Sequence, residues 1–482
     1  MRTIGTPWNC GRSYRRAAGC AGATLLASLL AGPSASAQSL TYGPILGRGH
    51  TPDQSIVRWG TGAATDATSL AFRKKGAAMW QLQSAGAARD HEVVLTGLAP
   101  GETYEYEVRS LTGTPEGGAF TTCPQAGRPM DFVFYGDSRT GFGTMAGEHA
   151  KVLMQVARKT PEMVFESGDI VPNGTYAQYL SEFFPVAKDL LRSTPFMAAP
   201  GNHDAISDLT SNYGAVFPSP RASGAPWQSY YSFTCGNALF LSLDSNKVSD
   251  TDQLNFLTAQ LDAGRDDRSI DHVFVWLHHA PYSVGSHGDN TTVQSKWVPL
   301  LNRPEYKVTA VFAGHDHLYA RMDDSSQVAY IVSGGAGANL YSDSGKSKAK
   351  KVISKMVYNF VSIHLAGLTM SAVAYDDTGT EIDRFAVTKT GGCPPAGCPT
   401  DGGTSDASTG PDLASGGGDG GVVSPDLAMP PPPSGGCAIA AVRGQHSTPD
   451  LGTLLLFGFA LCAAAARRAS VRSRPSRLLS ST

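Results

Sequence analysis

Five short polar clusters combine aspartate, asparagine and histidine at points where apolar segments end. In chain order they are Gly136-Asp137, Gly168-Asp169, Gly201-Asn202-His203-Asp204, His278-His279-Ala280-Pro281 and Gly314-His315-Asp316-His317. Imidazole and carboxylate groups suit ions such as zinc, iron and manganese. Any one cluster could be an ordinary surface loop, but five in this order predict a metal site.

The apolar segments before these clusters predict the strands that position them. These segments are residues 132–135, 163–165, 196–199, 273–277 and 308–313. Helices are predicted between them, at residues 144–159, 175–191, 252–263 and 291–302. Alternating strands and helices indicate an α/β domain with a parallel or mixed sheet, and such sheets place their sites beyond the carboxyl ends of the strands. The clusters should therefore meet along one edge of a sheet.

The preceding region has a different pattern. Residues 55–59, 91–95 and 103–108 alternate apolar and polar side chains, and turn residues separate them. This pattern predicts an all-β sandwich at residues 38–124. The segment from Leu95 to Tyr104 resembles the E–F corner of fibronectin type III-like domains. A packing role is favoured over ligand binding, because the region contains no cluster of metal-ligating residues.

The ordered blocks resemble those of the calcineurin-like metallophosphoesterases, and the ending GHDHLYAR after an N-terminal β-domain looks most like the purple acid phosphatase branch. The resemblance covers roughly residues 40–390, with the catalytic domain at 128–390. It implies an α/β, four-layer αββα fold, in which two sheets pack face to face between helices. It also implies two metal ions, drawn from iron, zinc and manganese, and a phosphate ester as substrate.

The resemblance also implies which residues bind the metals. The matching positions are Asp137 and His317 for the first metal, Asp169 for the bridge, and Asn202, His278 and His315 for the second metal. Of the adjacent pair we choose His278 over His279, because its distance to Tyr282-Ser283 fits the family block. The neighbouring residue in the family usually points away.

The same resemblance assigns the chemistry. A hydroxide bound to the metal pair attacks phosphorus, and His203 acts as the general acid with Asp204 beside it. Histidine suits proton transfer near neutral pH. The alternative is that His203 only binds phosphate. The expected activity is that of a metal-dependent, acid phosphatase-like phosphomonoesterase.

Two positions depart from the family pattern. Arg139 occupies the place of a histidine ligand, and Pro172 occupies the place of the tyrosine of purple acid phosphatases. Both usual fourth ligands of the first metal are therefore missing, which puts the iron–tyrosinate colour in doubt. His149 could replace them or be an ordinary helix residue. Arg139 could face the phosphate or pair with a carboxylate. His287 could line the cleft as a substrate-binding residue or lie in a plain loop.

Two other functions compete with a phosphomonoesterase. The same blocks would serve a phosphodiesterase, because the choice depends on the walls of the cleft. A non-catalytic surface binding or adhesion protein with a weakened metal site is the third hypothesis, and five intact blocks argue against it. The formal net charge is −2 and no Lys/Arg cluster stands out before the C-terminus, so no nucleic-acid partner is expected.

Both ends of the chain predict export. Residues 1–37 read as a signal peptide, with Ala35-Ser36-Ala37 at the cleavage site. Residues 391–436 are a Gly-, Pro-, Ser- and Asp-rich linker whose composition predicts disorder. Residues 437–482, with an apolar run at 451–466, resemble the C-terminal sorting tails of exported myxobacterial proteins. A simple transmembrane anchor is the alternative. Both place the protein outside the cytoplasm, attached to the cell surface or outer membrane.

The cysteines are compatible with an oxidising compartment. Cys393 and Cys398 could form a small disulfide or remain free thiols in the linker. Cys123 and Cys235 are a candidate pair in the globular part, although the sequence does not determine their connectivity.

Overall fold

The computed structural model describes residues 40–64, 67–110, 114–140, 147–222 and 225–389. The predicted signal peptide, linker and sorting tail lie outside these residues, and so do Cys393, Cys398 and the apolar run at 451–466. None of the helices in the described ranges has the length and apolar character needed to cross a bilayer.

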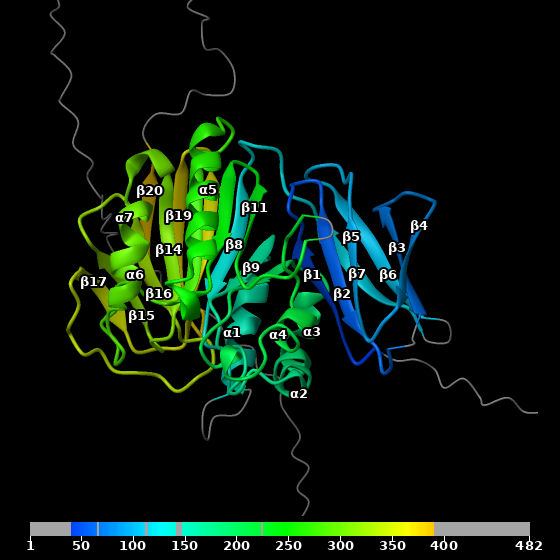
Figure 1. Ribbon diagram of the computed structural model, residues 1–482, viewed down its shortest axis with the longest axis horizontal. Helices are drawn as coiled ribbons and strands as arrows, with labels where there is room; N and C mark the ends of the chain where they lie inside the picture. Colours follow the sequence, from blue (N-terminus) through cyan, green and yellow to red (C-terminus); the bar gives the residue numbers. More distant parts are fainter. Residues whose placement is uncertain (1–39, 65–66, 111–113, 141–146, 223–224, 390–482) are drawn as a thin grey trace, which may run out of the picture. The chain divides into compact units, whose positions relative to one another are not determined.

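Two sheets form the centre of the domain that carries the polar clusters (Figure 1). The six-stranded sheet has the order β10 (Phe196–Ala198), β9 (Met163–Glu166), β8 (Met130–Tyr135), β18 (Asn359–Ala366), β19 (Thr369–Asp376) and β20 (Glu381–Thr388). The seven-stranded sheet has the order β11 (Tyr231–Cys235), β12 (Ala238–Ser242), β13 (His272–His279), β14 (Val308–Gly314), β16 (Ala329–Ser333), β15 (Tyr319–Asp323) and β17 (Lys350–Lys355). Both sheets mix parallel and antiparallel pairs.

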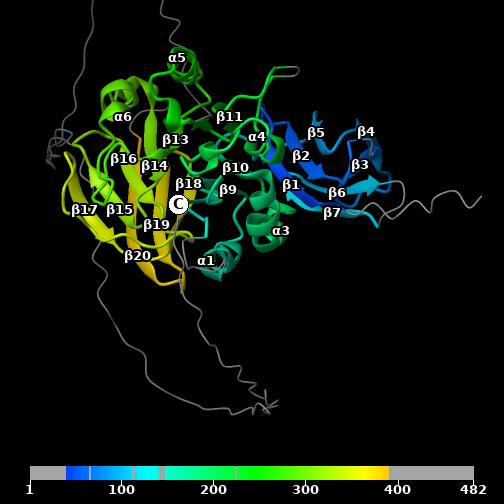
Figure 2. The ribbon, with the colours of Figure 1, turned by 60° about the horizontal axis from the view of Figure 1, so that its bottom comes forward.

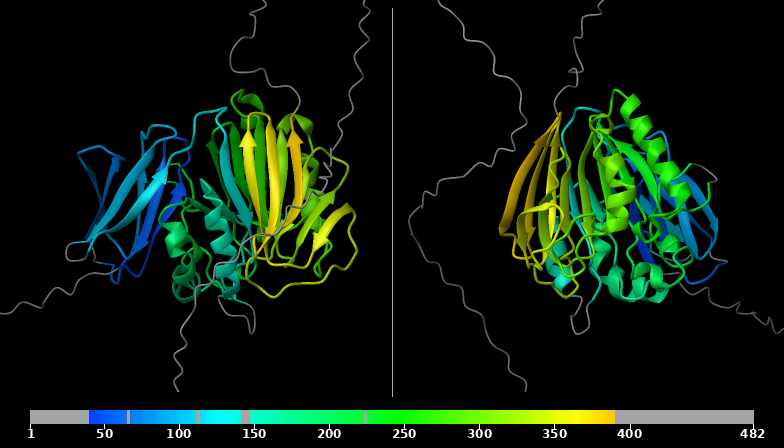
Figure 3. Two further views of the ribbon diagram at one scale, coloured as in Figure 1. Left: turned by 180° about the vertical axis from the view of Figure 1, so that it is seen from behind. Right: turned by 60° about the vertical axis from the view of Figure 1, so that its left-hand side comes forward.

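Helices lie on the outer face of the seven-stranded sheet and near the β8, β9 and β10 end of the six-stranded sheet (Figures 2 and 3). On the seven-stranded sheet they are α5 (Thr251–Asp266), α6 (Thr291–Lys296) and α7 (Val298–Leu301), which share a core with β12, β13 and β14. On the six-stranded sheet they are α1 (Gly147–Arg158), α2 (Tyr176–Gln178), η1 (Tyr179–Phe183) and α3 (Phe184–Leu191). The shorter helices are η2 (Asp204–Ile206), α4 (Tyr213–Val216), η3 (Ser245–Lys247) and η4 (Pro304–Tyr306). The predicted four-layer metallophosphoesterase fold is confirmed.

Aromatic side chains fill the space between the two sheets. The ring of Phe134 on β8 stacks on that of Phe312 on β14, with centroids 3.8 Å apart. Phe134 also stacks on Phe165 of β9 at 4.4 Å. Such pairs add about 0.5–1.5 kcal/mol each beyond the burial of apolar area. These contacts join the strands that lead into Asp137, Asp169 and His315, so the core fixes the loops of the site.

The predicted helices are present at the expected positions, but two of them are interrupted. The stretch predicted as one helix at 175–191 contains the π-turn η1 just before Pro185, which has no N–H to donate along the helix. Pro299 likewise stands at the start of α7, where the stretch predicted at 291–302 divides. Helix α5 begins where the Asp250 carboxylate accepts hydrogen bonds from the N–H groups of Asp252 and Gln253.

Strand predictions were right for the buried strands and missed several exposed ones. Strands β11, β12, β16, β18, β19 and β20 also lie on apolar or alternating stretches of the sequence. Between β19 and β20, the Gly379 N–H closes a hairpin turn by donating to the Asp376 carbonyl. Strand β17 was missed, because most of its side chains are exposed and it lacks an apolar face.

The N-terminal region forms two antiparallel sheets. The three-stranded sheet has the order β1 (Tyr42–Arg48), β2 (Ser55–Gly60) and β5 (Asp90–Leu95). The four-stranded sheet has the order β4 (Gln81–Ala87), β3 (Ala67–Lys74), β6 (Thr103–Ser110) and β7 (Glu116–Thr121). Trp59 is fully buried in their shared core. The Tyr104 hydroxyl accepts a hydrogen bond from the Ala99 N–H, a contact that pins the corner before β6. This is consistent with the predicted β-domain, and its assignment as fibronectin type III-like stays a prediction.

Buried links tie the N-terminal sheets to the larger domain. Cys123, just after β7, forms a disulfide with Cys235 at the end of β11, so that candidate pairing is confirmed. The buried guanidinium of Arg58 donates to the carbonyls of Gly214 and Phe217. These hydrogen bonds hold α4 and the residue after it against β2.

Candidate metal centre

All five polar clusters lie at the ends of strands β8, β9, β10, β13 and β14. Asp137, Asp169 and His315 have φ angles of 61°, 57° and 70°, in the left-handed region that few non-glycine residues adopt. Such backbone conformations cluster at functional sites, where the surrounding structure imposes them. Here they turn the chain sharply, so that residues from both sheets face one space.

The glycines of the clusters permit this close approach. A Cβ atom at Gly201 would lie 2.1 Å from Asp169 Oδ1, and one at Gly314 would lie 2.2 Å from Asp137 Oδ2. Both distances are too short for any side chain. The glycines therefore leave room for the two carboxylates.

His278 shows where a cation fits. Its Nδ1 lies 2.9 Å from the Ser167 carbonyl, which can only accept, so Nδ1 carries the proton. The ring is fully buried, and burial holds the pKa of His278 well below its usual value, so the ring is neutral and Nε2 carries a lone pair.

That lone pair faces other atoms of types that bind metal ions. His278 Nε2 lies 2.9 Å from Asn202 Oδ1, 3.1 Å from His315 Nδ1 and 3.3 Å from Asp169 Oδ1. Burial, and then the neighbouring His278, lowers the pKa of His315 to about 2. Such a set of neutral nitrogens and acceptor oxygens is stabilised when a cation lies between them. We call this set the second-metal half, and its residues fit a metal ion.

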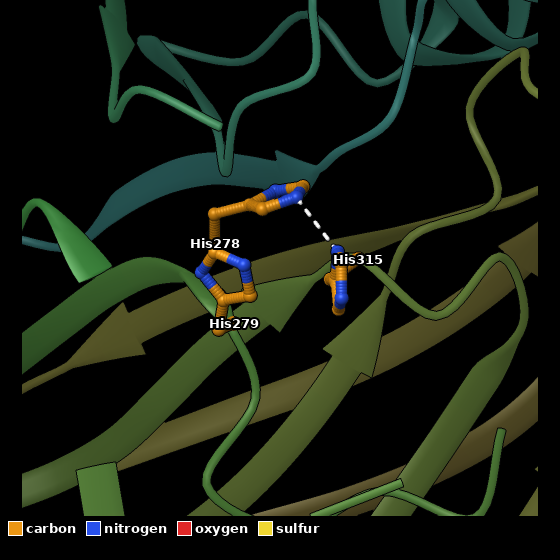
Figure 4. Close-up of side chains that lie close together, drawn as sticks. All are labelled: His278, His279 and His315. Carbon is orange, nitrogen blue, oxygen red and sulfur yellow. Dashed lines mark hydrogen bonds between the residues drawn. The ribbon is translucent and has the colours of Figure 1, made fainter. Parts of the chain in front are cut away.

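His279 corrects one expectation. It does not point away, because its ligand atom lies within 4.8 Å of those of His278 and His315 (Figure 4). The pairing of β13 with β14 is irregular between Trp276 and His279, and this irregularity brings consecutive residues to the same side. His279 Nδ1 also lies 2.9 Å from the Ser245 hydroxyl, which anchors the ring.

Asp137, His317 and the shared Asp169 form what we call the first-metal half. His317 Nδ1 donates to the Asn339 carbonyl at 2.6 Å, which leaves Nε2 facing Asp137 Oδ1 at 3.4 Å. That Oδ1 is buried and has no hydrogen-bond partner. Burial raises the pKa of Asp137. An orphaned carboxylate oxygen opposite an imidazole nitrogen fits a cation.

Arg139 stands beside this half. Its Nε lies 3.3 Å from Asp169 Oδ2, and its backbone N–H donates to the Asp169 carbonyl at 3.0 Å. Of the two orientations considered, the one toward a carboxylate is present. His149 packs elsewhere, with its ring stacked on Phe183 at 5.9 Å in the core under α1. It is an ordinary helix residue within the described part of the chain.

His203 faces the centre from the loop after β10. Its Nδ1 donates to the Pro172 carbonyl at 2.6 Å, and its Nε2 lies 3.8 Å from Asp169 Oδ2. The side chain is 27% exposed, so part of it is accessible from outside the centre. Pro172, at the position of the missing tyrosine, thus orients His203 through its carbonyl.

Asp204 does not face this open space. Its carboxylate accepts from the N–H groups of Asp169 and Gly201 and from the Tyr179 hydroxyl. It is fully buried, and burial raises its pKa to about 7. Asp204 therefore links two loops of the site to each other and does not face a substrate.

His287 lies over the second-metal half. Its ring is 4.0 Å from that of His315, and its Nδ1 lies 3.0 Å from Asp316 Oδ1. This hydrogen bond raises the pKa of His287. The side chain is 43% exposed and borders a groove between residues 285–289 and 344–348.

Sequence reasoning missed Asp316 and Tyr341. The Asp316 carboxylate accepts from Ser283, His287 and Gly288, which shapes the loop beside the centre. Tyr341 stacks on His317 with ring centroids 4.0 Å apart. Asp316 could have been suspected from its place between two candidate ligands. Tyr341 lies in a loop with no motif, and only the fold brings it to the site.

Comparison with known proteins agrees with this geometry. Residues 146–319 match the family described as calcineurin-like phosphoesterase. A Mycobacterium tuberculosis protein is 27% identical in an alignment of 263 residues that covers 47% of this chain and 49% of the relative. Human tartrate-resistant acid phosphatase type 5 is 30% identical over 185 residues, covering 34% of this chain and 54% of the relative. The chain spans about half the length of these curated relatives.

Among solved structures, the purple acid phosphatase PPD1 of yellow lupin aligns with a TM-score of 0.61 at 16% identity, covering 72% of this chain and 74% of that one. At this identity the match speaks for the fold alone. The chain therefore has the metallophosphoesterase fold, its residues 146–319 are similar to the calcineurin-like phosphoesterases, and its residues could hold a metal centre.

Proposed function

We propose that this metallophosphoesterase domain is an exported, binuclear-metal enzyme that hydrolyses phosphate monoesters in the manner of an acid phosphatase. The observation that carries the proposal is the convergence of Asp169, Asn202 and His315 on the buried lone pair of His278. The metals would be iron, zinc or manganese, held by the two halves described above. When bound, they would neutralise the phosphate and lower the pKa of a coordinated water.

The protein's own residues would supply orientation and a proton. Because Nδ1 keeps its proton in the hydrogen bond to the Pro172 carbonyl, the proton that His203 would transfer is the one on Nε2. There it would protonate the oxygen of the leaving alcohol. His287, held by Asp316, would contact the phosphate from the opposite loop.

A phosphodiesterase is the second candidate, because one feature favours it. The groove between residues 285–289 and 344–348 borders His287, and a second ester substituent would lie in it. A binding or adhesion protein with a relic site is less well supported, since the second-metal half has a complete set of donors.

Export belongs to the same proposal. The disulfide between Cys123 and Cys235 suits an oxidising compartment. The signal peptide predicted at 1–37 and the sorting tail predicted at 437–482 would place the enzyme outside the cytoplasm, attached to the cell surface. Fractionation of the native host, with antibody against the domain, should find it there. Recovery in the cytoplasm would contradict this part.

The activity is tested on the purified chain, first stripped of metal and then reloaded with Mn²⁺, Zn²⁺ or Fe³⁺/Fe²⁺. We expect turnover of p-nitrophenyl phosphate that is lost on stripping and returns on reloading. A preference for bis(p-nitrophenyl) phosphate would favour the diesterase. Failure to hydrolyse either ester in the loaded state would refute the proposed function.

A further inference from the structure

We propose that Arg139 makes the two halves of the metal centre unequal, so that the second-metal half binds its ion tightly and the first-metal half binds its ion more weakly. This inference rests on the metal centre of the proposed function. It adds which of the two halves binds its metal ion more tightly, a property that neither the fold nor the family match assigns.

The two oxygens of Asp169 face different neighbours. Oδ1 lies 3.3 Å from His278 Nε2 and accepts the N–H of His203, so it belongs to the second-metal half. Oδ2 lies 3.3 Å from Arg139 Nε. If Asp169 bridges two ions, Oδ2 is the oxygen left for the first one, and Arg139 already holds it.

The position of Arg139 is well defined. Its side chain is 10% exposed and that of Asp169 is 2% exposed, so water screens the pair little. The backbone N–H of Arg139 donates to the Asp169 carbonyl, which fixes the start of the side chain as well. The guanidinium therefore stays beside the bridging carboxylate.

A guanidinium acts against a metal ion in two ways. It has no lone pair to offer and keeps its charge at any pH that the protein tolerates, so it cannot replace a histidine ligand. Its positive charge also repels a cation on the same carboxylate. The first-metal half is left with Asp137, His317 and a share of Asp169.

Within the described ranges, neither His149 nor Pro172 supplies the missing ligand. His149 is buried in the aromatic core beside Tyr135 and Phe183. Pro172 offers only a carbonyl, and that carbonyl accepts from His203. The second-metal half, by contrast, has Asn202, His278 and His315 in addition to Asp169.

The test is a titration of the metal-stripped full chain with Mn²⁺, in which electron paramagnetic resonance counts the free ion. We expect two classes of site whose affinities differ by at least about tenfold, in line with the effect of a lost ligand or its support. Arg139→His should tighten the weaker class by about tenfold or more. Arg139→Lys, the matched control that keeps the charge, should leave the weaker class weak.

Single ligand variants assign the classes. His315→Ala should remove the tight class, and His317→Ala should remove the weak one. Two equal classes in the wild-type chain, or an Arg139→His chain with an unchanged weaker class, would overturn the inference. The titration involves no substrate, so a chain that binds two unequal ions and hydrolyses no ester would refute the proposed function and leave this inference standing.

Discussion

The second-metal half and the first-metal half share Asp169, yet the chain provides for them very differently. Around His278 Nε2, three donor atoms from Asn202, His315 and Asp169 lie within 3.3 Å. On the other side, His317 faces an unpartnered oxygen of Asp137, and Arg139 holds the remaining oxygen of Asp169. One fold can therefore support a complete site and an incomplete one on the two sides of one carboxylate.

The difference has a local cause. The second-metal half takes Asn202 from the loop after β10, His278 from the end of β13 and His315 from the loop after β14. The first-metal half takes His317 from that same loop and otherwise depends on the loops after β8 and β9, where the two departures from the family pattern occur, at Arg139 and Pro172. Pro172 instead positions His203. The residue at the position of the missing tyrosine ligand thus also fixes the orientation of His203, the proposed proton donor.

The largest effect should come from the residue that both halves share. Asp169→Asn removes the charge of the bridge, so we expect both ions to be lost and hydrolysis to fall by at least about a thousandfold. Metal analysis and p-nitrophenyl phosphate turnover measure this, and circular dichroism checks the fold. A variant that keeps both ions and its rate would mean that the two halves do not share this carboxylate.

His203→Ala should separate proton transfer from metal binding. We expect the turnover number for an alkyl phosphate to fall by about a hundredfold or more, because the leaving alkoxide then lacks a general acid. The loss should be smaller for p-nitrophenyl phosphate, whose leaving group needs little protonation. Metal content should stay at the wild-type level. Equal losses on both esters would point to a phosphate-binding role instead.

The folded chain loses stability at low pH, and this limits the pH range in which metal binding by the two halves can be compared. Burial lowers the pKa of His272 to about 4 from an ordinary value near 6.5. As the pH falls, His272 binds a proton at a higher pH in the unfolded chain than in the folded chain. Its contribution to stability is therefore complete above about pH 6.5 and is lost as the pH falls toward 4.

The full loss corresponds to about 3 kcal/mol of unfolding free energy. Urea melts of the metal-free chain at pH 7 and pH 4.5 should therefore differ more in the wild type than in His272→Gln. An equal pH dependence in both chains would exclude His272 as the source. A loss of metal binding that is measured between these two pH values has to be corrected for the fraction of chain that unfolds.

The smallest effect should come from His149→Leu. The imidazole Nε2 is buried without a hydrogen-bond partner, so an apolar side chain should cost less than about 1 kcal/mol of stability. Mn²⁺ binding should change by less than about twofold, because the ring is not a ligand. Loss of the weaker class of ion in this variant would identify His149 as the missing ligand and would revise the comparison.

Much of this could be predicted from local sequence. Buried strands such as β14 are continuous apolar runs, and the polar clusters follow them directly, so their place in the fold could be inferred. The fate of Arg139 could not be predicted, because a guanidinium suits a phosphate and a carboxylate equally well. His279 was misjudged because strand alternation fails at the irregularity near the end of β13.

The motifs and the apolar periods are local properties, so the residue types of the site and the order in which the strands deliver them could be inferred from the amino-acid sequence. Three features depend on the folded chain: which oxygen of Asp169 each neighbour holds, the support that Asp204 gives to two loops, and the stacking of Tyr341 on His317. These outcomes depend on atoms brought within about 4 Å by the packing of distant strands. Spacing along the chain carries no information on that scale.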